Sequence, residues 1–93
     1  MGSVTDGDSE RNQAAAGGSV KCEGVVFTLT MGNEVALVTR GGATRALGSE
    51  SYRDANTHTR HHFVDVQGKA EAMLFLVSVR EDQRCIVAVR RFS

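Results

Sequence analysis

Two β-rich stretches joined by the dipeptide Gly32-Asn33 constrain the fold of this chain more than any other feature. Residues 24–31 and 34–40 are dominated by valine, threonine and other residues that favour strands. A Gly-Asn dipeptide between two such stretches is typical of a two-residue hairpin turn, because glycine readily adopts the positive φ that these turns need. The turn predicts three pairs on one face of the hairpin: Met31 with Glu34, Leu29 with Ala36, and Phe27 with Val38. That face is apolar and the other is mixed, as expected for a sheet that packs on one side only.

A second hairpin is predicted in the last quarter of the sequence. Residues 72–80 and 84–92 are apolar on both faces and flank a polar turn in which Glu81 faces Arg84, so that opposite charges pair. This register aligns Val79 with Ile86, Val77 with Ala88, and Leu76 with Val89. Apolarity on both faces predicts central strands. If the last strand instead lies at the sheet edge, its free backbone groups form a template for another strand.

The region before the second hairpin permits two interpretations. Residues 61–67 predict a short strand, and the apolar run after Gly68 continues in the strand pattern. Four apolar residues also have helical spacing: Ala70, Met73, Leu74 and Val77. A helix near residues 69–77 would make the fold α+β. The β-branched residues that follow favour a strand. The sequence therefore predicts an all-β fold, a small antiparallel sheet or open barrel of five to six strands.

The two segments poorest in apolar residues define the expected domain boundaries. Residues 1–19 are rich in glycine, serine, aspartate and asparagine, and are expected to form a disordered N-terminal tail. Residues 20–93 are then a single small β-rich domain, whose modest size makes oligomerisation a natural source of additional stability. Residues 41–60 predict a long loop with a short helical turn around residues 51–55. Because long loops are uncommon in compact domains, an edge strand near residues 44–47 or a functional, mobile segment is the alternative.

Composition excludes several classes of protein and restricts the compartment. Eleven basic and eleven acidic residues cancel, so long-range attraction to nucleic acid or to an anionic membrane is not the dominant physics. No apolar run approaches the length of a membrane span, and no signal-peptide pattern is present. We therefore expect an intracellular protein, cytoplasmic or nuclear, without a membrane partner. Cys22 and Cys85 are expected to be buried thiols rather than a disulfide.

The titratable side chains do not predict a catalytic, metal or cofactor site. His58, His61 and His62 form the densest cluster, but adjacent strand residues point to opposite faces, so the three cannot converge on one ion. No motif of a nucleophile beside a base is present, and Gly41-Gly42 is not followed by a phosphate-binding sequence. The sequence predicts no cofactor, no metal and no enzymatic activity.

The arginines of the C-terminal hairpin are the candidate contact residues for a partner: Arg80, Arg84, Arg90 and Arg91. Nucleic-acid binding by a β-surface needs exposed aromatic residues beside such arginines, whereas the four phenylalanines lie in apolar runs and are expected in the core. A non-enzymatic protein-interaction or self-association module is therefore the predicted function. A small β-barrel nucleic-acid-binding domain that uses these arginines is the alternative.

The residues expected to be buried are Phe27, Leu29, Phe75, Val77 and Ile86.

Overall fold

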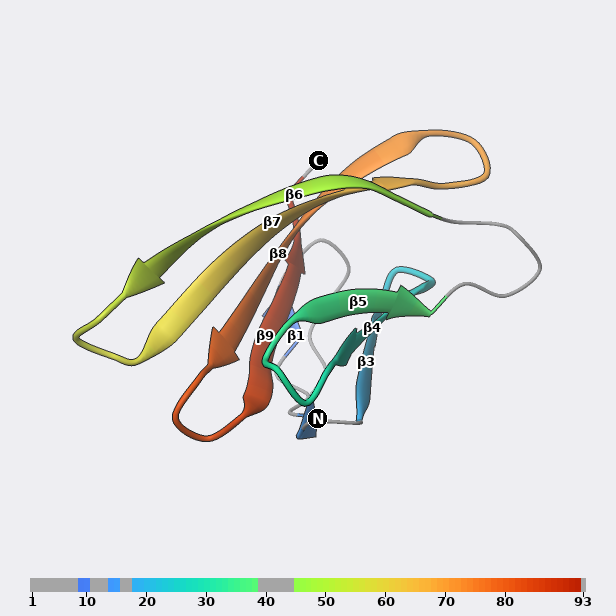
Figure 1. Ribbon diagram of the computed structural model, residues 1–93. Helices are drawn as coiled ribbons and strands as arrows, with labels where there is room; N and C mark the ends of the chain where they lie inside the picture. The colour runs from blue at the N-terminus through green and yellow to red at the C-terminus, as the bar shows by residue number, and fades with distance from the viewer. Residues whose placement is uncertain (1–8, 11–13, 16–17, 39–44, 93) are drawn as a thin grey trace.

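Two antiparallel β-sheets pack against each other in the computed structural model, which describes residues 9–10, 14–15, 18–38 and 45–92 (Figure 1). The sheets do not close into a barrel, and the described residues contain no helix. The prediction of an all-β antiparallel fold is confirmed. The helical alternative for residues 69–77 is wrong, because Ala72–Arg80 forms a strand with neighbours on both sides. None of the described segments is a helix long and apolar enough to cross a membrane.

The smaller sheet has three strands in the order β3-β4-β5. These are β3 (Ser19–Cys22), β4 (Val25–Leu29) and β5 (Val35–Val38). Glu23 and Gly24 connect β3 to β4 with φ values of 50° and 85°. A two-residue turn with positive φ at both positions matches the right-handed twist of the strands that it joins. Gly24, which the sequence placed at the start of a strand, therefore belongs to this turn.

The hairpin around Gly32-Asn33 is present, but its predicted register is wrong by one residue. Leu29 pairs with Val35 rather than with Ala36, because the connection is five residues long. The Thr30 hydroxyl accepts hydrogen bonds from the backbone N–H groups of Gly32 and Glu34, at 3.3 and 3.1 Å. These bonds stabilise a wider loop than the two-residue turn. As a result Val35 and Leu37 pack against the core, and Ala36 is exposed.

The larger sheet has four long strands in the order β9-β8-β7-β6. These are β6 (Arg45–Asp54), β7 (Thr59–Gln67), β8 (Ala72–Arg80) and β9 (Cys85–Arg91). Two dipeptide strands, β1 (Ser9–Glu10) and β2 (Ala14–Ala15), pair with β9 on its other side. The boundary that the sequence sets at residue 20 stays a prediction, although these four residues pair with the sheet.

The loop predicted for residues 41–60 is wrong for residues 45–54 and 59–60, which lie in strands, while residues 55–58 form a turn. Residues 45–54 form β6, a ten-residue strand at the sheet edge, and its side chains are almost all exposed. The short helical turn expected at residues 51–55 is absent, since this segment pairs with β7 up to Asp54. The alternative interpretation, an edge strand near residues 44–47, is closer to the structure, but the observed strand extends to Asp54. Residues 41–44 lie outside the described part of the chain.

The position of β9 contradicts the idea that the last strand is a free edge. It pairs with β8 on one side and with β1 and β2 on the other. The predicted pair Val79 with Ile86 is confirmed, but a bulge beyond it shifts the rest of the register. Val77 therefore pairs with Val89 and not with Ala88, and Leu76 pairs with Arg90. The free edge of the four long strands is β6.

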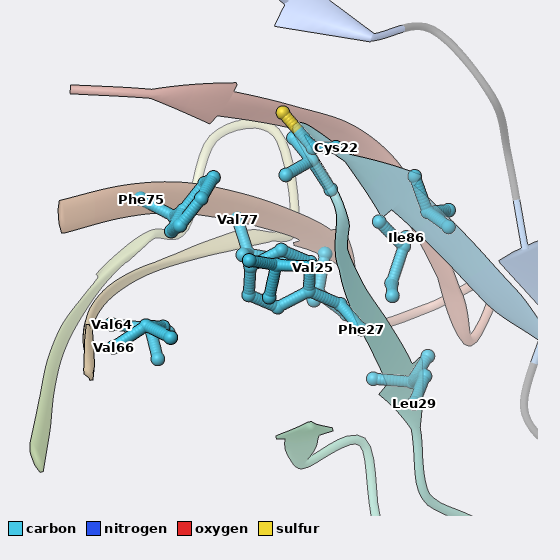
Figure 2. Close-up of a cluster of buried hydrophobic side chains, with 12 residues drawn as sticks. Cys22, Val25, Phe27, Leu29, Val64, Val66, Phe75, Val77 and Ile86 are labelled. Carbon is cyan, nitrogen blue, oxygen red and sulfur yellow. The ribbon is translucent and has the colours of Figure 1, made fainter. Parts of the chain in front are cut away.

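Side chains from both sheets fill the space between them (Figure 2). The rings of Phe27 and Phe75 meet edge to face, with 5.1 Å between centroids. The five residues predicted to be buried are each at most 1% exposed, which confirms that prediction: Phe27, Leu29, Phe75, Val77 and Ile86. Cys22 and Cys85 are both buried and form no disulfide, as the sequence indicated.

Candidate functional site

The face of the four-stranded sheet that points away from β3, β4 and β5 is the most unusual surface of the molecule. We call it the outer face. Phe75 and Val77 of β8 point into the core, so the alternation of a strand turns Leu74, Leu76 and Ser78 outward. In the described part of the chain the second sheet lies on the opposite side (Figure 1). Large apolar side chains of the outer face are consequently in contact with solvent.

Three cross-strand rows of side chains make up this face, each with one residue from β6, β7 and β8 and one from β9 or the residue directly after it. Written from β6 to β9, the Tyr52 row is Tyr52, His61, Ser78 and Ala88; the Glu50 row is Glu50, Phe63, Leu76 and Arg90; and the Gly48 row is Gly48, Asp65, Leu74 and Phe92. Phe92 joins its row through a hydrogen bond from its backbone N–H to the Leu74 carbonyl at 2.6 Å.

An aromatic track crosses the outer face from β6 to the end of β9. The Tyr52 ring stacks on His61 at 4.9 Å and lies 6.0 Å from Phe63, measured between centroids. Phe63 in turn meets Phe92 edge to face at 5.6 Å, and the Arg90 guanidinium lies 5.3 Å from the Phe92 centroid. Tyr52 and Phe92 are each about half exposed, at 52% and 50%. This is the combination of aromatic and apolar groups that marks interaction surfaces.

The expectation that the phenylalanines lie in the core is wrong for Phe63 and Phe92. A signal for Phe63 is present in the sequence. It shares its strand face with Asp65, whereas the residues out of phase with it, Val64 and Val66, are buried. In a strand the polar residue two positions away identifies the solvent side more reliably than the apolar residue next in sequence.

The four candidate arginines do not form one surface. Arg80 makes two hydrogen bonds to the Asp82 carboxylate, both at 3.0 Å, and Arg84 lies in the β8–β9 turn with a φ of 53°. Arg91 lies at the far end of β9 and binds Glu23 and Glu71, at 2.9 and 3.2 Å. Arg90 is next to it but points to the outer face, so the two diverge as the strand alternation predicts.

Glu81 has different partners from those that the sequence indicated. Its carboxylate accepts hydrogen bonds from Arg53 at 2.7 Å and from Arg60 at 3.0 Å, and not from Arg84. These two guanidinium groups hold the pKa of Glu81 below its ordinary value. The Glu81 backbone also bonds to His58 and Asn33, so this residue links the β6–β7 turn, the β4–β5 loop and the β8–β9 turn. Its role is therefore structural.

The three histidines are directed to different places. His58 is in the β6–β7 turn, His61 lies on the outer face with Nδ1 2.8 Å from the Ser78 hydroxyl, and His62 points to the core side. Among the residues that the structure describes, no three histidine, cysteine, aspartate or glutamate side chains are grouped as a metal site would require.

His62 lies beside a cleft of about 210 Å³ between β5 and the β6–β7 hairpin. Its lining residues include the apolar Val35, Leu37 and Val64, and polar and apolar atoms contribute to the lining about equally. The His62 Nε2 atom is buried, and within the described part of the chain it has no hydrogen-bond partner. The pKa of His62 is lowered below its ordinary value of 6.5, mainly because the imidazole is buried and secondly because Arg60 is positively charged. The imidazole is consequently neutral at neutral pH.

This shift predicts that acid weakens the fold before the carboxylates titrate. The unfolded chain binds a proton at His62 more readily than the folded chain does, so the free energy of unfolding falls as the pH drops below 6.5. We expect a lower melting temperature at about pH 5.5 than at about pH 7.5. His62→Gln should remove most of this difference, while His58→Asn, in an exposed turn, should leave it unchanged. An unaltered pH dependence in His62→Gln would assign the effect to another group.

Comparisons of the chain with protein-family models, with curated protein sequences and with solved structures return no match.

Proposed function

We propose that this chain is a non-enzymatic interaction module that associates with a second copy of itself through the outer face. The observation that carries this proposal is the aromatic track from Tyr52 to Phe92, which leaves large apolar groups in water on one side of a well-packed sheet. Exposed aromatic residues on a flat, rigid surface supply contact area at a low cost in conformational entropy.

The charges on this face favour a protein surface over nucleic acid as the partner. Glu50 and Asp65 flank the aromatic residues, and Arg90 is the one arginine or lysine in the three rows. A phosphate backbone would meet two carboxylates for each guanidinium, and it would be repelled. Arg80 and Arg91 are already neutralised by carboxylates. Nucleic-acid binding by the hairpin arginines is therefore the weaker candidate.

Sedimentation equilibrium of the full chain tests the proposal. We expect a reversible dimer, and we expect the double variant Tyr52→Ser, Phe92→Ser to raise its dissociation constant at least about tenfold, since both side chains are half exposed and belong to the aromatic track. Met31→Ser is the matched control, because Met31 is 70% exposed but lies in the β4–β5 loop, away from the outer face. A chain that is monomeric at all concentrations, or an equal response to both variants, would contradict the proposal. So would tight binding of a single-stranded oligonucleotide that the double variant loses.

A further inference from the structure

We infer that the two copies are related by a twofold axis parallel to the strands, so that Glu50 of each copy pairs with Arg90 of the partner subunit. This inference rests on the proposed self-association and specifies its geometry. It is carried by how charge is distributed along the Glu50 row, and the side-chain sizes in the other two rows are compatible with it.

The Glu50 row carries opposite charges at its two ends. Glu50 stands on β6 at one end and Arg90 on β9 at the other, with Phe63 and Leu76 between them. The two charges are about 14 Å apart, since three strand spacings separate them. Within the described residues neither Glu50 nor Arg90 takes part in an ion pair. Each end of the row therefore carries a charge that forms no ion pair with a described residue of the same chain.

A twofold axis along the strands satisfies both charges at once. When a second sheet stacks on the first about this axis, the rows keep their positions along the strands, and the β6 side of one copy covers the β9 side of the other. Glu50 then faces the partner's Arg90, and Arg90 faces the partner's Glu50. Asp65, one row away, lies diagonal to that same arginine. A twofold axis across the strands would instead stack Glu50 on the partner's Glu50, which like-charge repulsion disfavours. The charge pattern therefore distinguishes the two arrangements.

Side-chain size agrees with the same axis. In the Gly48 row, Phe92 of one copy comes to lie over the partner's Gly48, and in the Tyr52 row, Tyr52 comes to lie over the partner's Ala88. Large side chains thus meet the smallest residues of each row. A hollow of about 490 Å³ is open beside Gly48, lined also by Phe63, Asp65 and Leu74, and it offers room for the Phe92 ring. Parallel strand directions are also the usual arrangement of two stacked sheets, within about 30°.

The area of the outer face limits the affinity that the dimer can reach. Four strands about 4.8 Å apart and four residue spacings of about 3.4 Å give a projected area of roughly 260 Å² on each copy. This is below the area of about 800 Å² per partner that is usual in stable complexes. We therefore expect a reversible dimer with a dissociation constant in the micromolar range or weaker. Part of its affinity should be lost at high salt, because the two ion pairs are near the rim.

A charge-swap experiment tests the pairing directly. Glu50→Arg alone places two arginines opposite each other at both ends of the dimer, and Arg90→Glu alone places two glutamates there. Each single variant should therefore raise the dissociation constant at least about tenfold. An equimolar mixture of the two should sediment as a dimer again, because the arginine introduced into the first variant then faces the glutamate introduced into the second. The double variant Glu50→Arg, Arg90→Glu should also recover self-association.

Two controls separate this geometry from a general effect on folding or affinity. Lys21→Glu on β3 reverses an exposed charge of the small sheet and should leave the dimer unchanged. Gly48→Leu should block the dimer with an unchanged melting temperature of the monomer, because no atom lies within 4 Å of the position that its Cβ would take. A dimeric wild type whose two charge variants fail to restore each other in the mixture would overturn the pairing but keep the proposed function. A monomeric wild type would overturn both.

Discussion

Replacing Phe75 with alanine should lower the free energy of unfolding by about 3–5 kcal/mol. The Phe75 side chain is fully buried, stands in the centre of β8, and meets Phe27 of the opposite sheet edge to face at 5.1 Å. Its removal leaves a cavity at the point where the two sheets contact each other. Small domains have unfolding free energies near the lower end of about 5–15 kcal/mol, so a large part of the stability would be lost.

Phe92→Ala is the matched control for this prediction. It removes the same side chain from a position that is 50% exposed on the outer face, where the edge-to-face contact with Phe63 is worth about 0.5–1.5 kcal/mol. Both variants are measured by urea denaturation at a protein concentration that keeps the chain monomeric. The midpoint should fall strongly for Phe75→Ala and only slightly for Phe92→Ala. Equal midpoints would mean that Phe75 does not hold the sheets together.

The core could be predicted from the sequence because burial repeats every second residue there. Phe27 and Leu29 alternate with threonine, and Val77, Val79 and Ile86 lie in runs that exclude charge. Such a pattern is visible within a short stretch of sequence, so these buried residues can be predicted without knowledge of the strand pairing. The residues it selected are fully buried in the fold.

Strand β6 could not be predicted in the same way, because its side chains carry almost no burial signal. Nine of its ten residues are exposed. What holds this strand is its backbone pairing to β7, along with polar contacts such as Arg60 to the Ser51 hydroxyl at 3.1 Å. Backbone groups are the same for every residue type, so the sequence of an edge strand need not differ from that of a loop.

The two register errors have local causes that hydrophobic patterns do not contain. In the first hairpin, the Thr30 hydroxyl stabilises a wider loop than Gly32-Asn33 needs. In the second hairpin, a bulge lies between Ile86 and Ala88, and it moves the later residues by one position. A single hydrogen bond or a single extra residue is enough for such a shift, since the side-chain period of a strand is two.

The outer face depended on this register and was therefore missed as a site. Its rows bring together residues from four strands, and Glu50 and Arg90 are forty positions apart in the sequence. The interaction class predicted from the sequence depended on β9 being an edge strand, which the structure contradicts. Pairing of β9 with β1 and β2 occupies that edge, so an exposed sheet face takes the place of an exposed sheet edge in the proposal.

This change of surface alters what a proline at position 89 should do. On a free edge strand, Val89→Pro would weaken association and leave the fold intact. Here β9 has partners on both sides, and Val89 is fully buried opposite Val77. Whichever neighbour receives the Val89 N–H loses a ladder hydrogen bond, and the pyrrolidine ring must fit into a packed core.

We therefore expect Val89→Pro to destabilise the monomer by about 1–3 kcal/mol more than Val89→Ala does, because a backbone carbonyl of the sheet is left without its donor. Val89→Ala removes the two valine methyl groups and keeps the N–H, so the difference between the two variants isolates the backbone term. Thermal unfolding by circular dichroism, at low protein concentration, measures both. If the proline variant melts with the alanine variant and only its sedimentation changes, then β9 is an edge strand after all, and association through its backbone would replace association through the outer face.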